Sequence, residues 1–372
     1  MTQHSQPRRV LMTADTIGGV WTYAIELAAG LRPHGVDVIL ATMGGPVSTA
    51  QKEQLSRLPH VKLCESNYRL EWMDDPWEHV ERAGLWLQAL ERRYAPDIVH
   101  VNGFAHASLP WMAPVLTVGH SCVLSWFAAV KGHPAPSEWR RYACEVRRGL
   151  QAANCVVAPT NAMLRELIRC YGPLPNHQVI PNGRHPRTFA PAAKEPFVLS
   201  VGRLWDEAKN VGLLCEVAPA LAWPVTVAGC AAAPDHAPVA LPNVDCLGRL
   251  APPELADLYA RAAIYALPAR YEPFGLSALE AALSGCALVL GDIQSLREVW
   301  GDTAVFVPPN CPGAWRDALN SLIADPPRAA ALGRAARLRA SLYTRARFAS
   351  DYFNLYSRLV RNRTSREPAN AA

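Results

Sequence analysis

The chain has 372 residues, of which 50% are apolar and 19% charged, and its formal charge is +5. A chain of this length buries more apolar surface than one compact core accommodates, which predicts two domains. The charge is too small to favour nucleic acid as a partner, and no basic tract interleaved with aromatic residues argues otherwise. The polar N-terminus, Met1 to Arg9, has no apolar stretch of the length of a signal-peptide core, no segment has the length of a membrane span, and the ten cysteines form no C-x-x-C pair. We therefore expect a reduced, cytoplasmic protein whose cysteines lie in the core.

Missing motifs exclude several chemistries. No two glycines are separated by a single residue and no glycine precedes a lysine, which argues against a dinucleotide-binding turn and against a P-loop. The sequence also lacks a G-x-S-x-G elbow and an H-E-x-x-H zinc motif. D-x-D, a pair of carboxylates that can hold a divalent metal on a diphosphate, is absent too. We therefore expect cations and backbone N–H groups, with no metal and no cofactor, to handle any phosphate.

In chain order, short β-branched segments alternate with longer amphipathic segments, the pattern of parallel sheets joined by crossover helices. The strands expected in the first half are residues 10–13, 36–42, 61–64, 97–101, 115–118, 155–158 and 178–180. Between the first two, apolar residues recur at helical spacing, and Gly35 is placed to end that helix in the left-handed conformation. The strands expected in the second half are residues 197–201, 225–228, 244–247, 264–267, 287–290 and 304–307.

The chain should join its two doubly wound domains within residues 181–196, where four prolines prevent a continuous helix. We place the first domain at residues 1–185 and the second at residues 186–342, with further helices at 328–342 and 345–361 and a disordered tail at 363–372. Open α/β sheets bind ligands beyond the carboxyl ends of their strands, and two such edges can face each other across a cleft.

The most specific segment runs from Arg270 to Glu280, with two glutamates eight residues apart around Pro-Phe-Gly. It follows an expected strand, and Pro273 suits the start of a helix near Phe274 because proline has no N–H to leave unpaired. The N–H groups at that helix start form an anion site, and Glu280, two turns into the helix, can accept hydrogen bonds from a ribose diol. Glu272 can reach another part of the same ligand. Alternatively, both glutamates are ordinary acids at a helix end.

A second group of candidate site residues follows the first expected strand of the second domain. Arg203 follows that strand directly, and Lys209 comes just before the next expected helix. A guanidinium fork and an ammonium at the same strand edge suit a diphosphate. The alternative is an exposed pair on a loop.

Taken together, these motifs resemble those of family 4 of the retaining glycosyltransferases, over residues 10–345. In chain order they are Gly18-Gly19-Val20, Asp97-Ile98-Val99-His100, Val179-Ile180-Pro181-Asn182-Gly183, Arg203 with Lys209, and Glu272 with Glu280. The resemblance implies the GT-B fold, in which two Rossmann-like domains face across a cleft and hold the acceptor on the N-terminal side and the nucleotide-sugar on the C-terminal side. It also implies metal-independent transfer with retention of configuration, and a C-terminal helix, residues 343–362, that packs back on the first domain.

The resemblance assigns roles to residues of this sequence. Arg203 and Lys209 match the cations that neutralise the leaving diphosphate, and His120 matches an active-site histidine near the anomeric carbon. By the same resemblance, the residues that bind the donor are Gly18, Gly19, Arg203, Lys209, Glu272 on the sugar, Phe274, Gly275, Leu276, Ser277, and Glu280 on the ribose. The sequence departs from the common pattern in the six-residue step from Arg203 to Lys209, in Gly229-Cys230-Ala231, and in Arg184.

The acceptor is less well defined. His100, Asn102 and Trp126 are the candidate acceptor-binding residues, and an indole ring can stack on a sugar. Four arginines between residues 139 and 150 could bring the protein to an anionic membrane that carries a lipid-linked acceptor, or they could form a solvated helix face. His100 and His106 have no third ligand at useful spacing, so we expect no metal site.

These observations predict a retaining glycosyltransferase. It would move a sugar from a UDP- or GDP-sugar to a saccharide or lipid-linked saccharide, in the biosynthesis of a polysaccharide or glycoconjugate. It would act in the cytoplasm or at the cytoplasmic face of the inner membrane. The alternatives are a phosphorylase or a sugar-nucleotide epimerase of the same fold, or a protein that binds a sugar or nucleotide without catalysis.

Overall fold

The computed structural model describes residues 6–232 and 237–366. Contacts divide the chain into two units, which we call the first and second units. The first unit contains the residues up to Ser125, Pro134–Gly183 and the residues from Arg345 onward. The second unit contains Arg184–Thr344 together with the short segment Trp126–His133. The sequence did not predict that this short segment would belong to the second unit.

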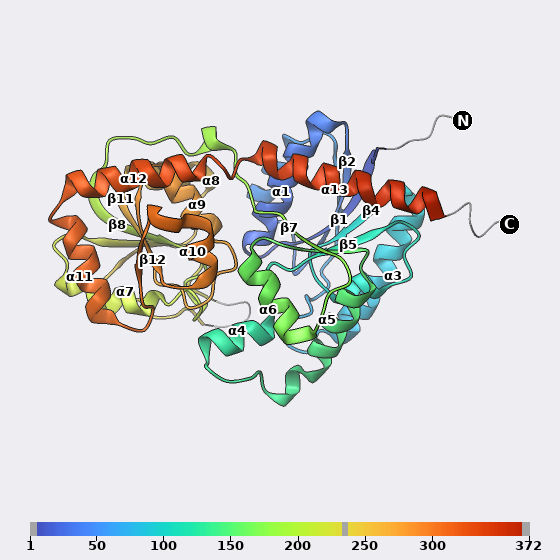
Figure 1. Cartoon of the computed structure of the whole chain (residues 1–372), viewed down its shortest axis with the longest axis horizontal. Coiled ribbons are helices and arrows are strands. Elements are labelled where there is room, and N and C mark those ends of the chain that lie inside the picture. Colours follow the sequence, from blue (N-terminus) through green and yellow to red (C-terminus); the bar gives the residue numbers. More distant parts are fainter. Residues whose placement is uncertain (1–5, 233–236, 367–372) are drawn as a thin grey trace. The chain divides into compact units, whose positions relative to one another are not determined.

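The first unit is built on a parallel sheet of seven strands in the order β3-β2-β1-β4-β5-β6-β7. Strands β1, β2, β4, β5 and β7 of this sheet are labelled in Figure 1. The strands are β1 (Arg9–Asp15), β2 (Asp37–Met43), β3 (Val61–Glu65), β4 (Ile98–Val101), β5 (Val115–Val118), β6 (Cys155–Ala158) and β7 (His177–Val179). All seven expected strands are present. The central strands are continuous apolar segments because helices cover both faces of a parallel sheet.

The helices of this unit are α1 (Gly19–Leu31), α2 (Thr49–Ser56), α3 (Trp77–Tyr94), α4 (Val123–Val130), α5 (Arg140–Ala152), α6 (Asn161–Tyr171) and α13 (Arg345–Arg366). Only residues 123–125 of α4 belong to this unit, and residues 126–130 belong to the second unit. After α1 the chain makes a short 3-10 turn, and Gly35 ends it in the left-handed conformation with φ 70°, as expected. Helix α13 completes the core of this unit, because Phe348, Tyr352 and Tyr356 lie fully buried in the same cluster as β1 and α1.

The second unit is built on a parallel sheet of six strands in the order β10-β9-β8-β11-β12-β13. The strands are β8 (Glu195–Val201), β9 (Val225–Ala228), β10 (Asp245–Cys246), β11 (Ala262–Leu267), β12 (Ala287–Gly291) and β13 (Val305–Val307). The helices are α7 (Val211–Val217), α8 (Pro252–Arg261), α9 (Leu276–Leu283), α10 (Gln294–Trp300), α11 (Pro312–Ile323) and α12 (Pro326–Ala340). Two Rossmann-like units are thus confirmed.

Strand order indicates the ligand-binding edge of each sheet, because ligands of open α/β sheets bind at the carboxyl ends of the strands where the order changes direction. In the first sheet this point lies between β1 and β4, and in the second it lies between β8 and β11. Gly18 and Gly19 follow β1, Arg203 follows β8, and Glu272 follows β11. The sequence motifs therefore lie at the topological switch points.

Two expectations need correction. Helix α13 continues through Arg366, so residues 363–366 of the expected disordered tail are helical, and the rest of that tail lies outside the described residues. The cysteines are all free thiols, as expected, but not all belong to the core. The exposed ones are Cys144, Cys230, Cys246 and Cys311. These four cysteines are therefore not part of the apolar core.

Candidate functional site

Arg203 lies in the loop after β8, where a buried carboxylate holds its guanidinium. Its Nη2 lies 2.7 Å from Oδ2 of Asp206, a residue that is only 5% exposed. The other oxygen of Asp206 accepts hydrogen bonds from the Ala208 N–H at 3.0 Å and from the indole N–H of Trp126 at 3.2 Å. Burial by itself would raise the pKa of Asp206, but Arg203 and Lys209 outweigh it and hold the pKa below its usual value. Asp206 is therefore an anion that orients Arg203.

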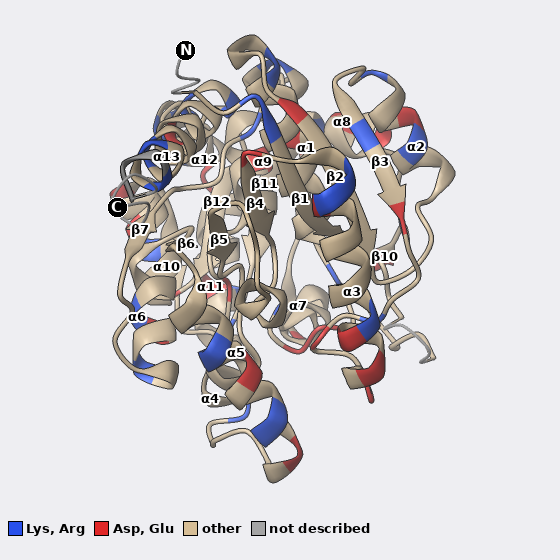
Figure 2. Cartoon of the chain, turned by 90° about the vertical axis from the view of Figure 1, so that its right-hand side faces the viewer, with Lys and Arg blue, Asp and Glu red and all other residues tan. Residues whose placement is uncertain are grey.

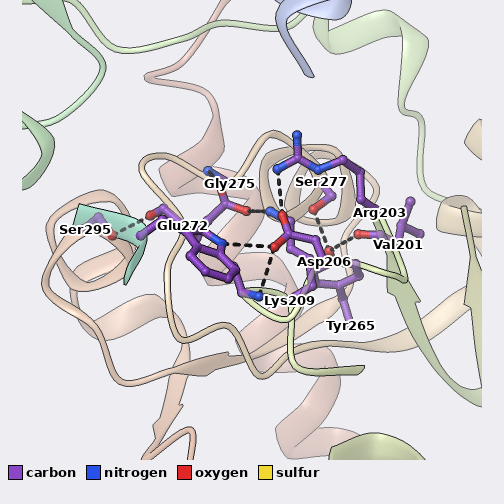
Figure 3. Close-up of polar contacts among 11 residues, drawn as sticks. Val201, Arg203, Asp206, Lys209, Tyr265, Glu272, Gly275, Ser277 and Ser295 are labelled. Atoms are coloured by element: carbon purple, nitrogen blue, oxygen red, sulfur yellow. Dashed lines mark hydrogen bonds and ion pairs between the residues drawn. The ribbon is translucent and has the colours of Figure 1, made fainter. Parts of the chain in front are cut away.

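Lys209 and Glu272 form a second ion pair, which joins the loop after β8 to the loop after β11 (Figure 3). Both side chains are largely buried, at 14% and 11% exposure. The Oε1 of Glu272 accepts the Gly275 N–H at 3.1 Å, and the Glu272 carbonyl accepts the Ser295 hydroxyl at 2.5 Å. These contacts hold the Glu272 carboxylate rigidly beside the ammonium.

The start of α9 differs from the expected one. The helix begins at Leu276, so Pro273 lies in the preceding loop, and Gly275 makes the turn into the helix at φ 89°. The Gly275 N–H, expected to bind phosphate, donates to Glu272 instead. A left-handed residue before the helix turns this N–H back toward the loop, which a sequence pattern does not reveal.

The remaining residues of the expected donor motif support this turn. Phe274 is buried and packs edge-to-face on Tyr343, with 5.6 Å between ring centroids. The Ser277 hydroxyl accepts a hydrogen bond from the Tyr265 hydroxyl at 2.7 Å (Figure 3). Leu276 is partly buried and packs against the apolar core cluster of the second unit, to which Phe274 belongs. The side chains of Phe274 and Leu276 thus anchor the loop, and only backbone groups there remain candidates for ligand contact.

Glu280, on α9, is paired with Arg184, whose position the sequence did not determine. The Nε of Arg184 lies 2.9 Å from Oε1 of Glu280, and both side chains are at least 86% buried, at 14% and 10% exposure. The guanidinium also stacks over Phe189, 4.9 Å from the ring centroid. The Arg184 N–H donates to the carbonyl of Tyr343 at 3.0 Å. Arg184 therefore fixes the carboxylate that the motif assigns to ribose.

The second unit thus places Arg203, Lys209, Glu272 and Gly275 in the loops at one edge of its sheet, with Ser277 in the first turn of α9 and Glu280 further along that helix. Its cations are held by carboxylates, so they are preorganised to meet a negatively charged group without moving far. In the described part of the chain, no group of three His, Cys, Asp or Glu side chains is arranged to hold a metal ion.

The first unit holds the other expected residues. Gly18 lies before α1 at φ 80°, ψ −151°, and Gly19 is the first residue of that helix. His100 is completely buried and is held by three hydrogen bonds, so its side chain is an internal one rather than a surface contact for an acceptor. Asn102 and the half-buried His120 are hydrogen-bonded to each other at 2.8 Å. Trp126, also expected to bind the acceptor, belongs to the second unit and donates to Asp206.

The basic segment expected near residues 139–150 is α5. Arg141 pairs with Glu81 of α3 at 2.7 Å, and Arg148 pairs with Glu145 at 2.6 Å. Basic and acidic residues are interspersed along α3 and α5 (Figure 2). These ion pairs favour the solvated helix face over a uniformly basic surface. None of the helices in residues 6–232 and 237–366 is long and apolar enough to cross a membrane.

Two parallel Rossmann-like sheets of this topology form the GT-B fold, and solved structures share this fold. Sucrose-phosphate synthase from Thermosynechococcus elongatus superimposes with a TM-score of 0.79 at 20% identity, over 95% of this chain and 99% of that chain. An Anabaena protein solved with UDP and glucose superimposes with a TM-score of 0.73 at 16% identity, over 94% of this chain and 99% of that one.

Sequence comparison identifies the family. Residues 17–187 match the model of Glycosyltransferase Family 4, and residues 195–325 match that of Glycosyl transferases group 1. The chain belongs to this family of glycosyltransferases. One similar relative is a D-inositol 3-phosphate glycosyltransferase from Kineococcus radiotolerans, which is 28% identical over 99% of this chain and 97% of its own length.

Proposed function

We propose that this glycosyltransferase moves a sugar from a nucleoside-diphosphate sugar, UDP or GDP, to a saccharide or lipid-linked saccharide acceptor. In this proposal the transfer retains the anomeric configuration and needs no metal, and the protein acts in the cytoplasm. The observation that carries the proposal is the paired cations, Arg203 and Lys209, at the switch point of the second sheet. Cations held rigidly at a strand edge can neutralise a leaving diphosphate without a divalent ion.

The proposed reaction breaks the bond between the anomeric carbon and the diphosphate oxygen, and the diphosphate leaves with the electron pair. Arg203 and Lys209 stabilise the developing charge, Glu280 binds the ribose, and Glu272 binds hydroxyls of the sugar. The acceptor hydroxyl enters on the face from which the diphosphate departs, forms the new bond to the anomeric carbon and gives its proton to the departing phosphate oxygen. No side chain acts as a covalent nucleophile. We assign a catalytic role in the same transfer to His120 as well.

Calorimetry with UDP, GDP, ADP and TDP, each in EDTA and in Mg²⁺, tests the donor site. We expect one diphosphate to bind equally well in both buffers and to lose affinity in Arg203→Ala. The control is Arg261→Ala, which removes an arginine of α8 that is also ion-paired but whose side chain is 38% exposed. Failure of all four nucleotides to bind, or binding only with Mg²⁺, would overturn the proposed donor site.

The products test the reaction itself. The matching nucleotide-sugar would be incubated with candidate acceptors, and proton NMR would report the anomeric configuration of the new bond. Because a similar relative is named for D-inositol 3-phosphate, the acceptors should include inositol phosphates beside free and lipid-linked saccharides. Release of a rearranged sugar without an acceptor would indicate an epimerase, and consumption of inorganic phosphate a phosphorylase.

A further inference from the structure

A hydrogen-bond network, buried at His100 and partly buried at Asn102 and His120, lies in the first unit, and its members come from distant parts of the chain. They are Thr13 of β1, Tyr23 of α1, His100 of β4, Asn102 after β4, His120 after β5 and Tyr356 of α13. The ring of Tyr23 packs edge-on against His120, with 4.4 Å between centroids. Asn102 is the residue to which both histidines are bonded.

The orientation of the Asn102 amide follows from its partners. Its Nδ2 lies 2.6 Å from the carbonyl oxygen of Thr13, and its backbone N–H donates to the Thr13 hydroxyl at 2.8 Å. A carbonyl oxygen can only accept a hydrogen bond, so the atom facing Thr13 has to be the amide NH₂. The amide oxygen Oδ1 therefore faces the two histidines.

An amide oxygen also can only accept, so the ring nitrogens that contact Oδ1 have to carry protons. These nitrogens are Nε2 of His120 at 2.8 Å and Nε2 of His100 at 3.2 Å. In a neutral imidazole the other nitrogen, Nδ1, then has the lone pair. For His100 this agrees with a hydroxyl donor, because Tyr356 lies 2.6 Å from its Nδ1.

Both rings are held in the neutral form. Burial lowers the pKa of His120 to about 3, and burial, together with the neighbouring His120, lowers the pKa of His100 to about 3. The titratable groups that face His120 include Tyr23 and His100, and burial raises the pKa of Tyr23, so it is uncharged too. A neutral ring has two tautomers, and what selects between them is the hydrogen bond at one nitrogen.

We propose that Asn102 is a positioning residue for glycosyl transfer: its amide oxygen holds His120 in the Nε2–H tautomer, so that Nδ1 is the nitrogen that accepts a hydrogen bond. The His100–Tyr356 pair braces this amide and ties it to α13. The inference rests on the proposed function, because it assumes that His120 acts at the reaction centre.

Nitrogen-15 NMR of the histidine rings tests the tautomer without any substrate. The signal of His120 is identified by its loss in His120→Gln. We expect the Nε2–H pattern in the full-length protein from pH 5 to 8, and a mixture of tautomers in Asn102→Ala. An Nδ1–H pattern in the wild-type protein, or an unchanged pattern in Asn102→Ala, would overturn the role of Asn102.

Kinetics separate positioning from a structural effect. Asn102→Ala should lower kcat by at least about tenfold, because a wrong tautomer presents a proton where a lone pair is needed, and leave the donor KM within about twofold. Asn102→Asp keeps an acceptor oxygen for His120 but loses the Nδ2 donor to the Thr13 carbonyl; its charge should raise the pKa of His120 and add a loss of activity below that new pKa. A normal kcat in Asn102→Ala would refute the role of Asn102.

The matched control is Tyr356→Phe, which removes a hydroxyl from the same network without touching Asn102. Its His120 spectrum should remain Nε2–H, and a change to the other tautomer would show that Asn102 alone does not hold the ring. Thermal unfolding of each variant verifies that the first unit is folded. A wild-type protein that transfers no sugar, while its His120 shows the Nε2–H tautomer, would overturn the proposed function rather than the tautomer.

Discussion

At the scale of single residues, the second unit pairs three cations with three carboxylates: Arg203 with Asp206, Lys209 with Glu272, and Arg184 with Glu280. Breaking a buried pair on one side leaves the partner charge uncompensated, so variants at these positions change both stability and ligand binding. Conservative substitutions and exposed controls are therefore needed to separate the two effects.

Lys209→Ala should reduce kcat more than it raises the donor KM, by at least about tenfold in kcat, if the ammonium acts on charge that develops as the diphosphate leaves. Lys209→Arg, which keeps the charge beside Glu272, should recover part of the rate. Steady-state kinetics measure both constants. The control is Lys62→Ala, which removes an exposed lysine on β3. An effect confined to KM would mean that the cation serves binding alone.

Glu280→Gln should weaken nucleotide binding by about 1.5–3 kcal/mol, the value of a hydrogen bond to a charged group. The melting temperature should also fall, because the buried guanidinium of Arg184 loses its counter-charge. Calorimetry and thermal unfolding are compared with Glu216→Gln, an exposed glutamate on α7. Unchanged nucleotide affinity would remove Glu280 from the ribose site.

We expect ionised Asp206 to stabilise the folded protein at neutral pH and to lose this effect in acid. Its pKa in the folded protein lies below the unfolded value of about 3.9, so its stabilising effect is present above that value and is lost as pH falls toward the folded pKa. At pH 7, Asp206→Asn should lower the free energy of unfolding by about 1.5–3 kcal/mol. The cost should shrink toward pH 3 in urea unfolding experiments.

The control for Asp206 is Asp257→Asn, which breaks an exposed aspartate–arginine pair on α8. Exposed pairs contribute about 0–1 kcal/mol, so this variant should unfold almost like the wild type at both pH values. Equal effects of the two substitutions would show that burial of Asp206 adds nothing to its ion pair.

At the scale of elements, α1 and α13 approach closely because Gly30 has no side chain. A Cβ built at Gly30 would lie 2.5 Å from the Cβ of Ala349, closer than two such carbons can pack. A few residues away, Arg345 of α13 pairs with the buried Glu26 of α1 at 2.5 and 3.0 Å. The small residue and the ion pair together fix how the last helix lies on the first.

Gly30→Ala should therefore destabilise the first unit by about 1–3 kcal/mol, although alanine favours helix over glycine, because the helices would have to separate. The control is Gly212→Ala in α7, where a Cβ would meet no atom within 4 Å, and which should cost nothing. Urea unfolding followed by circular dichroism measures both. A stabilised Gly30→Ala protein would contradict the close helix contact.

At the scale of the whole molecule, the core of the first unit is completed by α13, which follows the entire second unit in the sequence. Large buried side chains of α13, Phe348, Tyr352, Leu355, Tyr356 and Leu359, lie in the same core cluster as β1. Burying each such side chain contributes about 1.5–3 kcal/mol, so their sum is comparable to the stability of an entire domain. The N-terminal strands thus depend on α13 for their core.

A chain that ends at Thr344 should consequently leave the first unit without a stable core, whereas a chain that ends at Arg366 should fold normally. Hydrogen exchange followed by mass spectrometry would show fast exchange in peptides from β1 and β4 of the shorter chain, with protection retained in β8 and β11. Continued protection of β1 in the shorter chain would show that α13 is dispensable.

Local patterns in the sequence predicted the strands of both sheets, the left-handed Gly35 and the positions of Arg203, Lys209, Glu272 and Glu280. Apolar runs and turn residues specify such features over a few neighbouring residues. The same patterns placed the start of α9 near Phe274, whereas the helix begins at Leu276. They also assigned the Gly275 N–H to a ligand, whereas it donates to Glu272. The conformation of Gly275 depends on the Glu272 carboxylate that folds back onto it.

Length, composition and motif order by themselves determined two parallel α/β domains and a glycosyltransferase of family 4. Only the tertiary structure decided which partners the candidate residues have, because those partners are far apart in sequence. Arg184 meets Glu280, Trp126 meets Asp206, and His100 meets Tyr356 across 256 positions. Burial then converts each encounter into a fixed charge pair or hydrogen bond, since a polar group removed from water has to find its partner within the protein.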